Sequence, residues 1–428
     1  MQQFNNVTIG CLQKPELLSP AGNLDILKMA FLYGADAVYC GTPKFAMRSR
    51  VGFTEKDLKE GIEYAHSIGK KVFVTINAFP HPGDIEELKI HIKETIKLNP
   101  DALIIADPGL VAFVKDIFDI PIHLSTQANT TNQLTAQFWA DQGVERIVLA
   151  RELSLDEIKI IKNNLTIQQF NNLQLEAFVH GAMCMAYSGR CQISNYLTGR
   201  DPNKGECIQA CRFKYKLYGL EEDYRQGEIF PVYEDEEGSH ILNSRDLCMI
   251  EYIPELISAG ISSFKIEGRL KTEYYVATVT RAYRKAIDSY FTNESTYREK
   301  QEELKSEVEK TSNRGFTTGF YLNKPDKASN NYEKSKATSE WGYIGRVIGY
   351  NKATKMSRVE VKNYFPSNSS AEIITPDKVI SLSEVSLRTE SGEIEVAHAG
   401  NIVNIPTPCV AKDSLIRIMN PAQTGKVA

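Results

Sequence analysis

Five of the eight cysteines in this chain lie within one stretch of 65 residues. They are Cys184, Cys191, Cys207, Cys211 and Cys248. Cysteines scattered at random over 428 positions rarely gather in this way. Thiolates bind soft metals, whereas a framework of disulfides needs an oxidising compartment. The N-terminal residues lack the basic and apolar segments of a secretory signal, so we interpret the cysteines as metal ligands in a reducing cytoplasm.

The spacing of the cysteines limits which kinds of metal site they can form. Structural zinc sites are usually built from pairs of cysteines that are separated by about two to four residues. Only Cys207 and Cys211, with three residues between them, have this spacing, whereas six residues separate Cys184 from Cys191. An iron–sulfur cluster is larger and accepts four thiolates at irregular spacings. We favour a four-iron cluster, with a zinc ion or a set of buried or free thiols as the alternatives.

Long motifs surround these cysteines. The run EAFVHGAMC extends from Glu176 to Cys184, and YSGRCQIS follows from Tyr187 to Ser194. Together they resemble the signature of the collagenase-like peptidase family U32. The downstream runs Arg200–Asn203, Cys207–Arg212 and Asn243–Asp246 resemble more narrowly a branch that is associated with tRNA 5-hydroxyuridine synthesis. The resemblance extends over essentially the whole chain.

The resemblance implies a cofactor, a cosubstrate and a substrate. Cys184, Cys191 and Cys207 match the cluster ligands of the family, and relatives take the fourth ligand from the position of either Cys211 or Cys248. We favour Cys211, because a ligand so close to Cys207 closes a shorter loop. The hydroxylating branch is implied to use prephenate, a dicarboxylate, and to convert the wobble uridine of tRNA to 5-hydroxyuridine without molecular oxygen.

Composition sets broad limits on the protein. A chain of 428 residues suits one large domain and one small one. No apolar run approaches the ~20 residues that a membrane span needs, so we expect no membrane association. The net charge of −4 and the pI of about 6.1 give no global sign of nucleic-acid binding, which counts mildly against an RNA substrate.

Short apolar runs alternate with helical patterns from Pro15 onward, which is typical of repeated βα units with a parallel sheet. Eight such units predict a (β/α)8 TIM-type barrel over residues 1–324. The expected strands are Glu16–Ser19, Ala37–Cys40, Lys71–Asn77, Ala102–Ala106, Ile122–Thr126, Arg146–Ala150, Leu175–His180 and Ser263–Glu267.

Several of these strands carry polar side chains on one face. Successive side chains of a strand point to opposite faces, and active sites of such barrels lie at the carboxyl ends of the strands. We therefore expect the polar faces to meet in the lumen at the mouth of the barrel. The polar sets are Thr75 with Asn77, His123 with Ser125 and Gln127, Glu176 with His180, and Lys265 with Glu267 and Arg269.

Three further segments complete the domain organisation. The insertion at about 181–259, between the seventh and eighth strands, is far longer than an ordinary βα connection and carries the cysteines. Residues 325–340 are polar without periodicity and are interpreted as a linker. From residue 341 to 428, short alternating runs predict a small antiparallel β-barrel of six or seven strands.

The candidate catalytic residues are Glu176, His180 and Glu267, which could transfer protons or form ion pairs with Lys265 or Arg269. Because bidentate arginines suit a dicarboxylate, we expect substrate binding by arginines near the mouth together with two amide side chains. The expected binding residues are Arg190, Arg269, Arg151, Gln127 and Asn77.

Two other functions remain open. A related branch of the family is implied to hydroxylate a cytidine of ribosomal RNA, which is the first alternative. The family name suggests a peptidase, which needs an activated nucleophile or a metal-bound water. The sequence contains no H-E-x-x-H and no G-x-S-x-G motif, so peptidase activity is the less favoured alternative.

Overall fold

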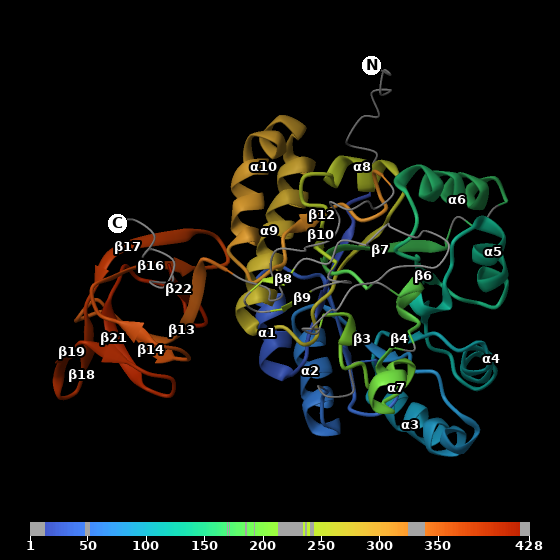
Figure 1. Ribbon diagram of the computed structural model, residues 1–428, viewed down its shortest axis with the longest axis horizontal. Helices are drawn as coiled ribbons and strands as arrows, with labels where there is room; N and C mark the ends of the chain where they lie inside the picture. The colour runs from blue at the N-terminus through green and yellow to red at the C-terminus, as the bar shows by residue number, and fades with distance from the viewer. Residues whose placement is uncertain are drawn as a thin grey trace.

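The computed structural model describes residues 13–47, 52–168, 170, 172–184, 186–191, 193–212, 234–235, 238–239, 244–323 and 339–419. Most of the predicted linker at 325–340 lies outside the described residues, and its prediction stays a prediction. The two largest hydrophobic cores among the described residues lie between Leu17 and Tyr321 and between Ile344 and Ile418. The larger core belongs to a barrel and the smaller one to a C-terminal β domain (Figure 1).

Eight parallel strands form a closed barrel, as predicted. Each strand pairs with its neighbour in chain order, and the last strand pairs with both the first and the seventh, which closes the sheet. The strands are β1 (Glu16–Pro20), β2 (Ala37–Gly41), β3 (Lys71–Ile76), β4 (Ala102–Ile105), β5 (Ile122–Leu124), β6 (Arg146–Val148), β7 (Gln174–Ala182) and β11 (Ser263–Ile266).

Helices surround the barrel (Figure 1). The Thr54 side chain accepts a hydrogen bond from the Asp57 amide at the start of α2, and Ser154 and Glu157 form a capping box at the start of α6. The helices are α1 (Leu24–Leu32), α2 (Glu55–Ser67), α3 (Ile85–Lys97), α4 (Pro108–Ile117), α5 (Gln133–Asp141), α6 (Leu155–Ile167), α8 (Ile253–Ser258), α9 (Glu273–Thr292) and α10 (Glu294–Glu309).

The alternation of side chains separates two layers of the barrel core. On β3, Val72, Val74 and Ile76 pack in the large cluster between strands and helices. Phe73, between them, belongs to a separate small cluster with residues such as Tyr39 and Ile104. The small cluster fills part of the lumen, so the lumen is packed with side chains and is not an open channel.

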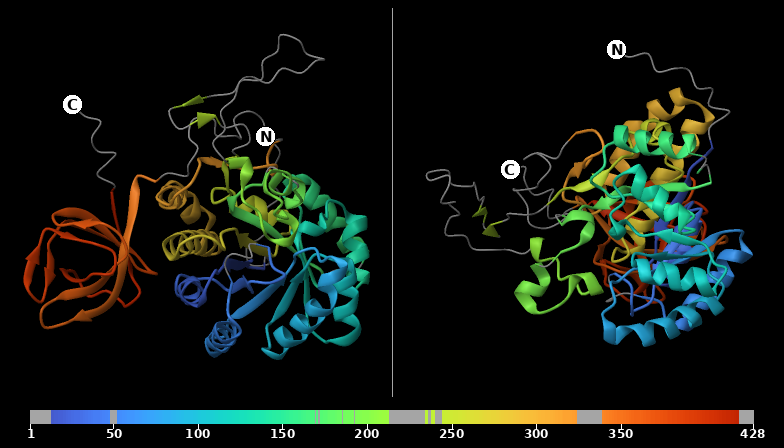
Figure 2. Two further views of the ribbon diagram at one scale, coloured as in Figure 1. Left: turned by 60° about the horizontal axis from the view of Figure 1, so that its bottom comes forward. Right: turned by 90° about the vertical axis from the view of Figure 1, so that its right-hand side faces the viewer.

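The insertion after β7 contains short elements. It includes α7 (Ile193–Thr198) and the strand β10 (Asp246–Cys248), which pairs antiparallel with the end of β7. A further short strand, β12 (Phe316–Thr317), pairs with β10. In the right-hand view of Figure 2, the segment around α7 projects from the body of the barrel domain.

The C-terminal domain is an eight-stranded antiparallel sheet that curls into a half-barrel. This confirms the predicted antiparallel β domain, but its main sheet has eight strands and not six or seven, because Val379–Val385 and Leu387–Thr389 form separate strands. Glu384, with a φ of 87°, lies within the first of these two strands, and Ser386 separates them. The strands are β13 (Trp341–Asn351), β14 (Met356–Val361), β16 (Ser369–Ile374), β17 (Val379–Val385), β18 (Leu387–Thr389), β19 (Gly392–Ile394), β21 (Ile402–Pro406) and β22 (Leu415–Met419).

The half-barrel packs against α1, α9 and α10 through a polar interface. Arg417 is fully buried, and its guanidinium pairs with Glu307 of α10 at 2.7 Å and with Glu372. The Tyr33 hydroxyl donates to the carbonyl of Ile374 at 2.8 Å. The aromatic rings of Tyr274 and Tyr343 stack across the same interface. No helix in the described residues combines the length and the apolar character that crossing a membrane requires.

Candidate functional site

A pocket lies where the carboxyl ends of the barrel strands meet the insertion after β7. Its walls come from the barrel and from the cysteine loop. The name cysteine loop is used here for residues 183–212 without 185 and 192. The barrel contributes Asn77, Gln127, Arg151, Lys265, Glu267 and Arg269. The cysteine loop contributes Cys184, Ser188, Cys191, Ser194, Cys207 and Cys211. The predicted meeting of the polar lumen and the cysteines is therefore found in the structure.

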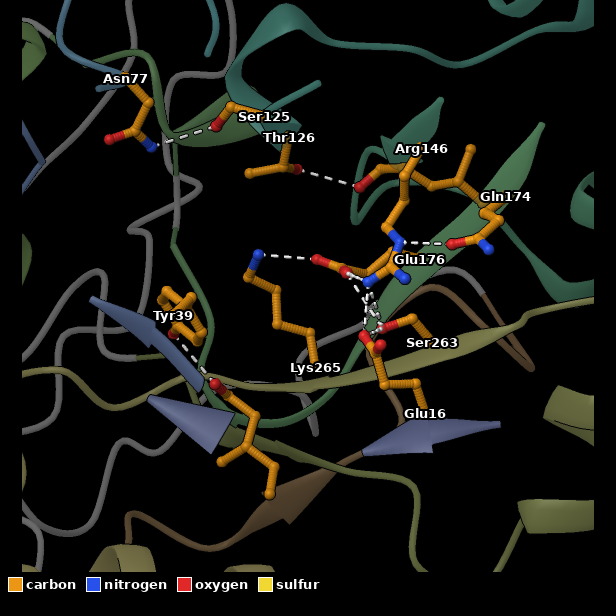
Figure 3. A network of polar contacts seen from close by, with 12 residues as sticks. Glu16, Tyr39, Asn77, Ser125, Thr126, Arg146, Gln174, Glu176, Ser263 and Lys265 are labelled. Atoms are coloured by element: carbon orange, nitrogen blue, oxygen red, sulfur yellow. Dashed lines mark hydrogen bonds and ion pairs between the residues drawn. The ribbon is translucent and has the colours of Figure 1, made fainter. Parts of the chain in front are cut away.

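A buried ion network supports the floor of this pocket (Figure 3). The Glu176 carboxylate receives Lys265 Nζ at 2.7 Å and Arg146 Nη1 at 3.1 Å, and Arg146 also pairs with Glu16. Burial by itself raises the pKa of Glu176, but the charges of Lys265 and Arg146 outweigh it and lower the pKa to about 2. Glu176 therefore stays ionised in the folded protein.

Glu176, a predicted catalytic residue, lies beneath the pocket and not in its wall. Its side chain is fully buried beneath the pocket and does not line it. Lys265, its partner, does line the pocket, and its ammonium group lies 4.4 Å from the centre of the Tyr39 ring. Glu176 therefore positions Lys265. The alternation of side chains along the predicted strand had already placed Lys265 on the same polar face as Glu267 and Arg269.

Arg269 is held at the pocket wall by a hydrogen bond to Thr75 and by the close approach of the backbone at Gly41. Its Nη1 donates to Thr75 Oγ1 at 2.7 Å. A Cβ atom at Gly41 would collide with the Arg269 guanidinium, so this position of β2 admits no side chain. The sequence prediction missed Gly41, because nothing in its local pattern reveals a neighbour that lies more than 200 residues away in the chain.

Two lining groups keep unused hydrogen-bonding capacity. Gln127 is 3% exposed, and its Nε2 has no hydrogen-bond partner among the described residues. Arg151 donates to the carbonyl of Ala182 at 3.3 Å and lies over the Phe178 ring, and it takes part in no ion pair within the described chain. Asn77, by contrast, is engaged, since its amide donates to Ser125 Oγ at 3.1 Å. An unpaired donor and an unpaired cation favour an anionic or carbonyl ligand.

Arg190 has a different place from the one predicted. Its Nε donates to the carbonyl oxygen of Gln127 at 2.9 Å, its guanidinium lies over the Phe79 ring, and it does not line the pocket. The short turn Tyr187–Gly189 directs it to the outside of the loop. Arg190 therefore fastens the cysteine loop to the barrel.

Other contacts dock the cysteine loop on the barrel mouth. Ser188 is fully buried, and its amide donates to Glu152 Oε1 at 2.6 Å while its hydroxyl donates to Asn129 at 2.6 Å. On the opposite side, the amide of Phe79 donates to the carbonyl of Asn203 at 3.1 Å. The loop is thus held from both sides of the pocket.

The surroundings of the cysteines fit thiolates that bind a metal cofactor. The Asn203 side chain clamps Cys191 by accepting from its amide at 3.2 Å and donating to its carbonyl at 3.0 Å. Backbone amides two residues further along the chain donate to the sulfurs of Cys191 and Cys207, each at 3.4 Å. Such donors stabilise negative charge on sulfur.

The arrangement of the cysteines bears on the choice between one ion and a cluster. Among the described residues, no three His, Cys, Asp or Glu side chains are grouped closely enough to hold a metal ion. Cys184, Cys191, Cys207 and Cys211 are instead distributed around the pocket wall. The four thiols therefore share one pocket, and the choice between a cluster and a zinc ion stays a prediction.

Cys211 and Cys248 lie in different surroundings. Cys211 lines the pocket with the other three cysteines. Cys248 lies on β10 opposite His180, is buried, and receives the Tyr283 hydroxyl at 3.9 Å. Burial raises the pKa of the Cys248 thiol to about 12. Cys248 does not line the pocket.

His180 also lies away from the pocket, which corrects its predicted place at the mouth. Its ring is enclosed by the rings of Tyr275, Tyr283 and Phe316. Burial, together with the charge of Lys271, lowers the pKa of His180 to about 3, so the imidazole is neutral near neutral pH. The strand alternation fails here because the pairing of β7 with β11 shifts register between Phe178 and His180, while β10 pairs with the end of β7.

Both domains of the chain are similar to those of known proteins. Residues 22–331 match the model of peptidase family U32, and residues 339–417 match that of the peptidase family U32 C-terminal domain. The chain is 38% identical to the tRNA hydroxylation protein P of Escherichia coli over 419 residues, which cover 89% of this chain and 90% of that protein.

Two further relatives show the range of the similarity. The tRNA hydroxylation protein P of Helicobacter pylori is 41% identical over 424 residues, which cover 94% of this chain and 98% of that protein. The 23S rRNA 5-hydroxycytidine synthase of Escherichia coli is 41% identical over 274 residues, which cover 64% of this chain and 39% of that protein. Of these three relatives, the two that cover about nine tenths of this chain carry names that refer to tRNA.

Proposed function

This chain belongs to peptidase family U32, and from that premise we propose that it is an RNA-modifying enzyme that takes part in the hydroxylation of tRNA. The proposed product is 5-hydroxyuridine at the wobble position. The proposed cosubstrate is prephenate, and molecular oxygen takes no part. Since tRNA is the substrate, the expected location is the cytoplasm.

The observation that carries the proposal is the meeting of four cysteines with a cationic wall around one pocket. Cys184, Cys191, Cys207 and Cys211 are the proposed ligands of a four-iron cluster. Bound there, such a cluster supplies one-electron chemistry next to the substrate. The amide donors to Cys191 and Cys207 support the thiolate form that this ligand set requires.

The charges of the pocket suit a dicarboxylate. Arg151, Lys265 and Arg269 face Glu267, which is the one carboxylate among the described lining residues. Glu176 offsets the charge of Lys265 from below, and Arg151, which takes part in no ion pair among the described residues, is the arginine that we assign to a carboxylate group. Gln127 Nε2 adds a donor for a carbonyl or carboxylate oxygen. These residues bind and orient prephenate in our proposal.

Glu267 is the residue to which we assign a proton transfer. It lines the pocket, and its backbone is fixed because its amide donates to the His180 carbonyl at 2.8 Å and its carbonyl accepts from Tyr275 at 3.0 Å. A carboxylate on a fixed backbone can accept a proton from bound substrate. His180 contributes to this site through its backbone carbonyl, which accepts the hydrogen bond from the Glu267 amide, and not through its imidazole.

The alternatives receive less support from the same site. A cysteine peptidase needs a base beside its nucleophile, and the described lining residues include no histidine. Hydroxylation of a ribosomal RNA cytidine would suit the same pocket. The relative named for that reaction matches 64% of this chain, compared with 94% for a relative named for tRNA hydroxylation.

The test uses a bacterial strain that lacks every route to 5-hydroxyuridine. We expect the wild-type chain to restore this nucleoside in tRNA, measured by mass spectrometry of digested tRNA and ribosomal RNA. Arg151→Gln should reduce it at least about tenfold, because a charged hydrogen bond to substrate is worth roughly 1.5–3 kcal/mol. Arg388→Gln, which changes an exposed arginine of the half-barrel, is the matched control.

The outcomes distinguish the three functions. Restored 5-hydroxyuridine supports the proposal. Its absence in cells that contain the folded wild-type protein refutes it. Hydroxycytidine that appears in ribosomal RNA instead would transfer the assignment to the first alternative, and gelatin cleavage by the pure protein would revive the peptidase.

A further inference from the structure

An exposed aromatic ring lies at the edge of the pocket. Among the described residues, three large aromatic side chains are more than half exposed: Tyr187 at 57%, Phe138 at 52% and Tyr364 at 51%. Tyr187 stands between Ala186 and Ser188, which both line the pocket, whereas Phe138 lies on α5 and Tyr364 lies in the half-barrel. An exposed ring next to a pocket can contact a ligand that reaches into it.

The backbone holds Tyr187 in a fixed place. Its neighbour Ser188 is buried with a φ of 49° and is tied to Glu152 and Asn129 by two hydrogen bonds of 2.6 Å. The Arg190 amide closes the turn by donating to the Tyr187 carbonyl at 3.0 Å. A ring on such a turn binds a partner with little loss of conformational entropy.

Two exposed arginines accompany the ring on the cysteine loop. Arg190 and Arg200 are exposed, and within the described chain neither takes part in an ion pair. Lys204 is different, because it pairs with Asp84 at 2.6 Å. Guanidinium groups without a carboxylate partner are suited to phosphate oxygens.

We propose that Tyr187, Arg190 and Arg200 form an RNA-docking rim, on which an unpaired base stacks against Tyr187 while the two arginines bind flanking phosphates. This inference rests on the proposed function and names how the same site recognises its RNA. The rim favours unpaired RNA over a duplex, because a ring can stack only on a base whose face is accessible. The base next to the stacked one is then delivered to the pocket.

The experiment measures binding to a fluorescent RNA hairpin with a uridine-containing loop and to a blunt RNA duplex of equal length, by anisotropy. Tyr187→Ala should weaken hairpin binding about 5- to 100-fold, the range for one stacked base. Tyr187→Phe should stay within about twofold of the wild type, because it keeps the ring. Phe138→Ala removes an equally exposed ring far from the pocket and should change nothing.

Arg200→Gln tests the phosphate contact separately. It should lower the slope of log affinity against log salt concentration by about 0.7, the value for one phosphate of a single strand. Arg200 is the better choice than Arg190, because Arg190 also fastens the cysteine loop through Gln127. Thermal unfolding of each variant should match that of the wild type, since the changed side chains are exposed.

The results separate the rim from the proposed function. Equal hairpin affinity of Tyr187→Ala and the wild type overturns the rim, as does equal affinity for hairpin and duplex, or no binding by the wild type. If the wild type restores 5-hydroxyuridine while Tyr187→Ala binds normally, only the rim fails. If it binds hairpins through Tyr187 but restores no 5-hydroxyuridine, only the proposed function fails.

Discussion

The floor of the pocket and the cysteine loop above it are held in place by different forces. The floor consists of Glu176, Lys265 and Arg146, whose side chains are almost completely buried and paired with one another. The cysteine loop is docked by individual part-buried hydrogen bonds, such as those from Ser188 to Glu152 and from Arg190 to Gln127. The floor therefore contributes to the stability of the whole barrel. The docking hydrogen bonds determine only whether the cysteines are held at the pocket.

The strongest test of this difference is Glu176→Gln. The change leaves the buried Lys265 and Arg146 without their shared counter-charge, so we expect a loss of about 3–5 kcal/mol in the free energy of unfolding, measured with urea. Glu86→Gln, which removes the partner of Lys89 on the surface of α3, should cause no measurable change. A loss below about 1 kcal/mol for Glu176→Gln would show that the floor is not held by these charges.

A smaller and local effect is expected for Glu152→Gln. The change weakens the acceptor of the buried Ser188 amide, which is worth about 1–3 kcal/mol. We expect hydrogen exchange of the amides near Ser188 to become about 5- to 100-fold faster, with global stability unchanged. Asp156→Asn, at an exposed pair with Lys159, is the control. If global and local stability fall together, the proposed separation of floor and loop is incorrect.

The smallest expected effect is on the pH dependence of stability. It arises from His180, which lies in the barrel wall behind the pocket. The folded pKa of His180, about 3, lies below the value near 6.5 of an unfolded chain, so protonation favours the unfolded state. Its contribution to stability is therefore lost as the pH falls below about 6.5, with a slope of up to about 1.4 kcal/mol per pH unit.

His180→Asn should make the stability profile shallower between pH 6.5 and about 5. This window excludes Glu176, whose folded pKa of about 2 means that its contribution is lost between about pH 4.5 and 2. Urea unfolding at several pH values measures the slope. Identical slopes for the variant and the wild type would show that His180 is protonated in the folded protein.

Much of the barrel could be predicted because its information is local. Alternating apolar and polar residues identify each strand, and the loop residues Thr54 and Ser154 mark helix starts. The pairing of Glu176 with Lys265 was also among the expected ion pairs, since both lie on inward faces of neighbouring strands. The convergence of polar strand ends on the cysteine loop followed from the topology alone.

The errors come from contacts between distant parts of the chain. His180 was expected at the mouth by strand alternation, but the antiparallel pairing of β10 with β7 changes its surroundings. Arg190 was expected at the pocket, but it donates to a carbonyl 63 residues earlier in the chain and does not line the pocket. The half-barrel was expected to have six or seven strands, but its main sheet has eight. Local patterns carry no information about such partners.

The most direct test of the central claim is a measurement of iron and acid-labile sulfide in protein purified without oxygen. The wild type and Cys248→Ser should each contain about four iron and four sulfide per chain, as a four-iron cluster requires, and Cys211→Ser should lose most of both. Zinc without sulfide in the wild type would contradict the account. So would full iron content in Cys211→Ser together with its loss in Cys248→Ser.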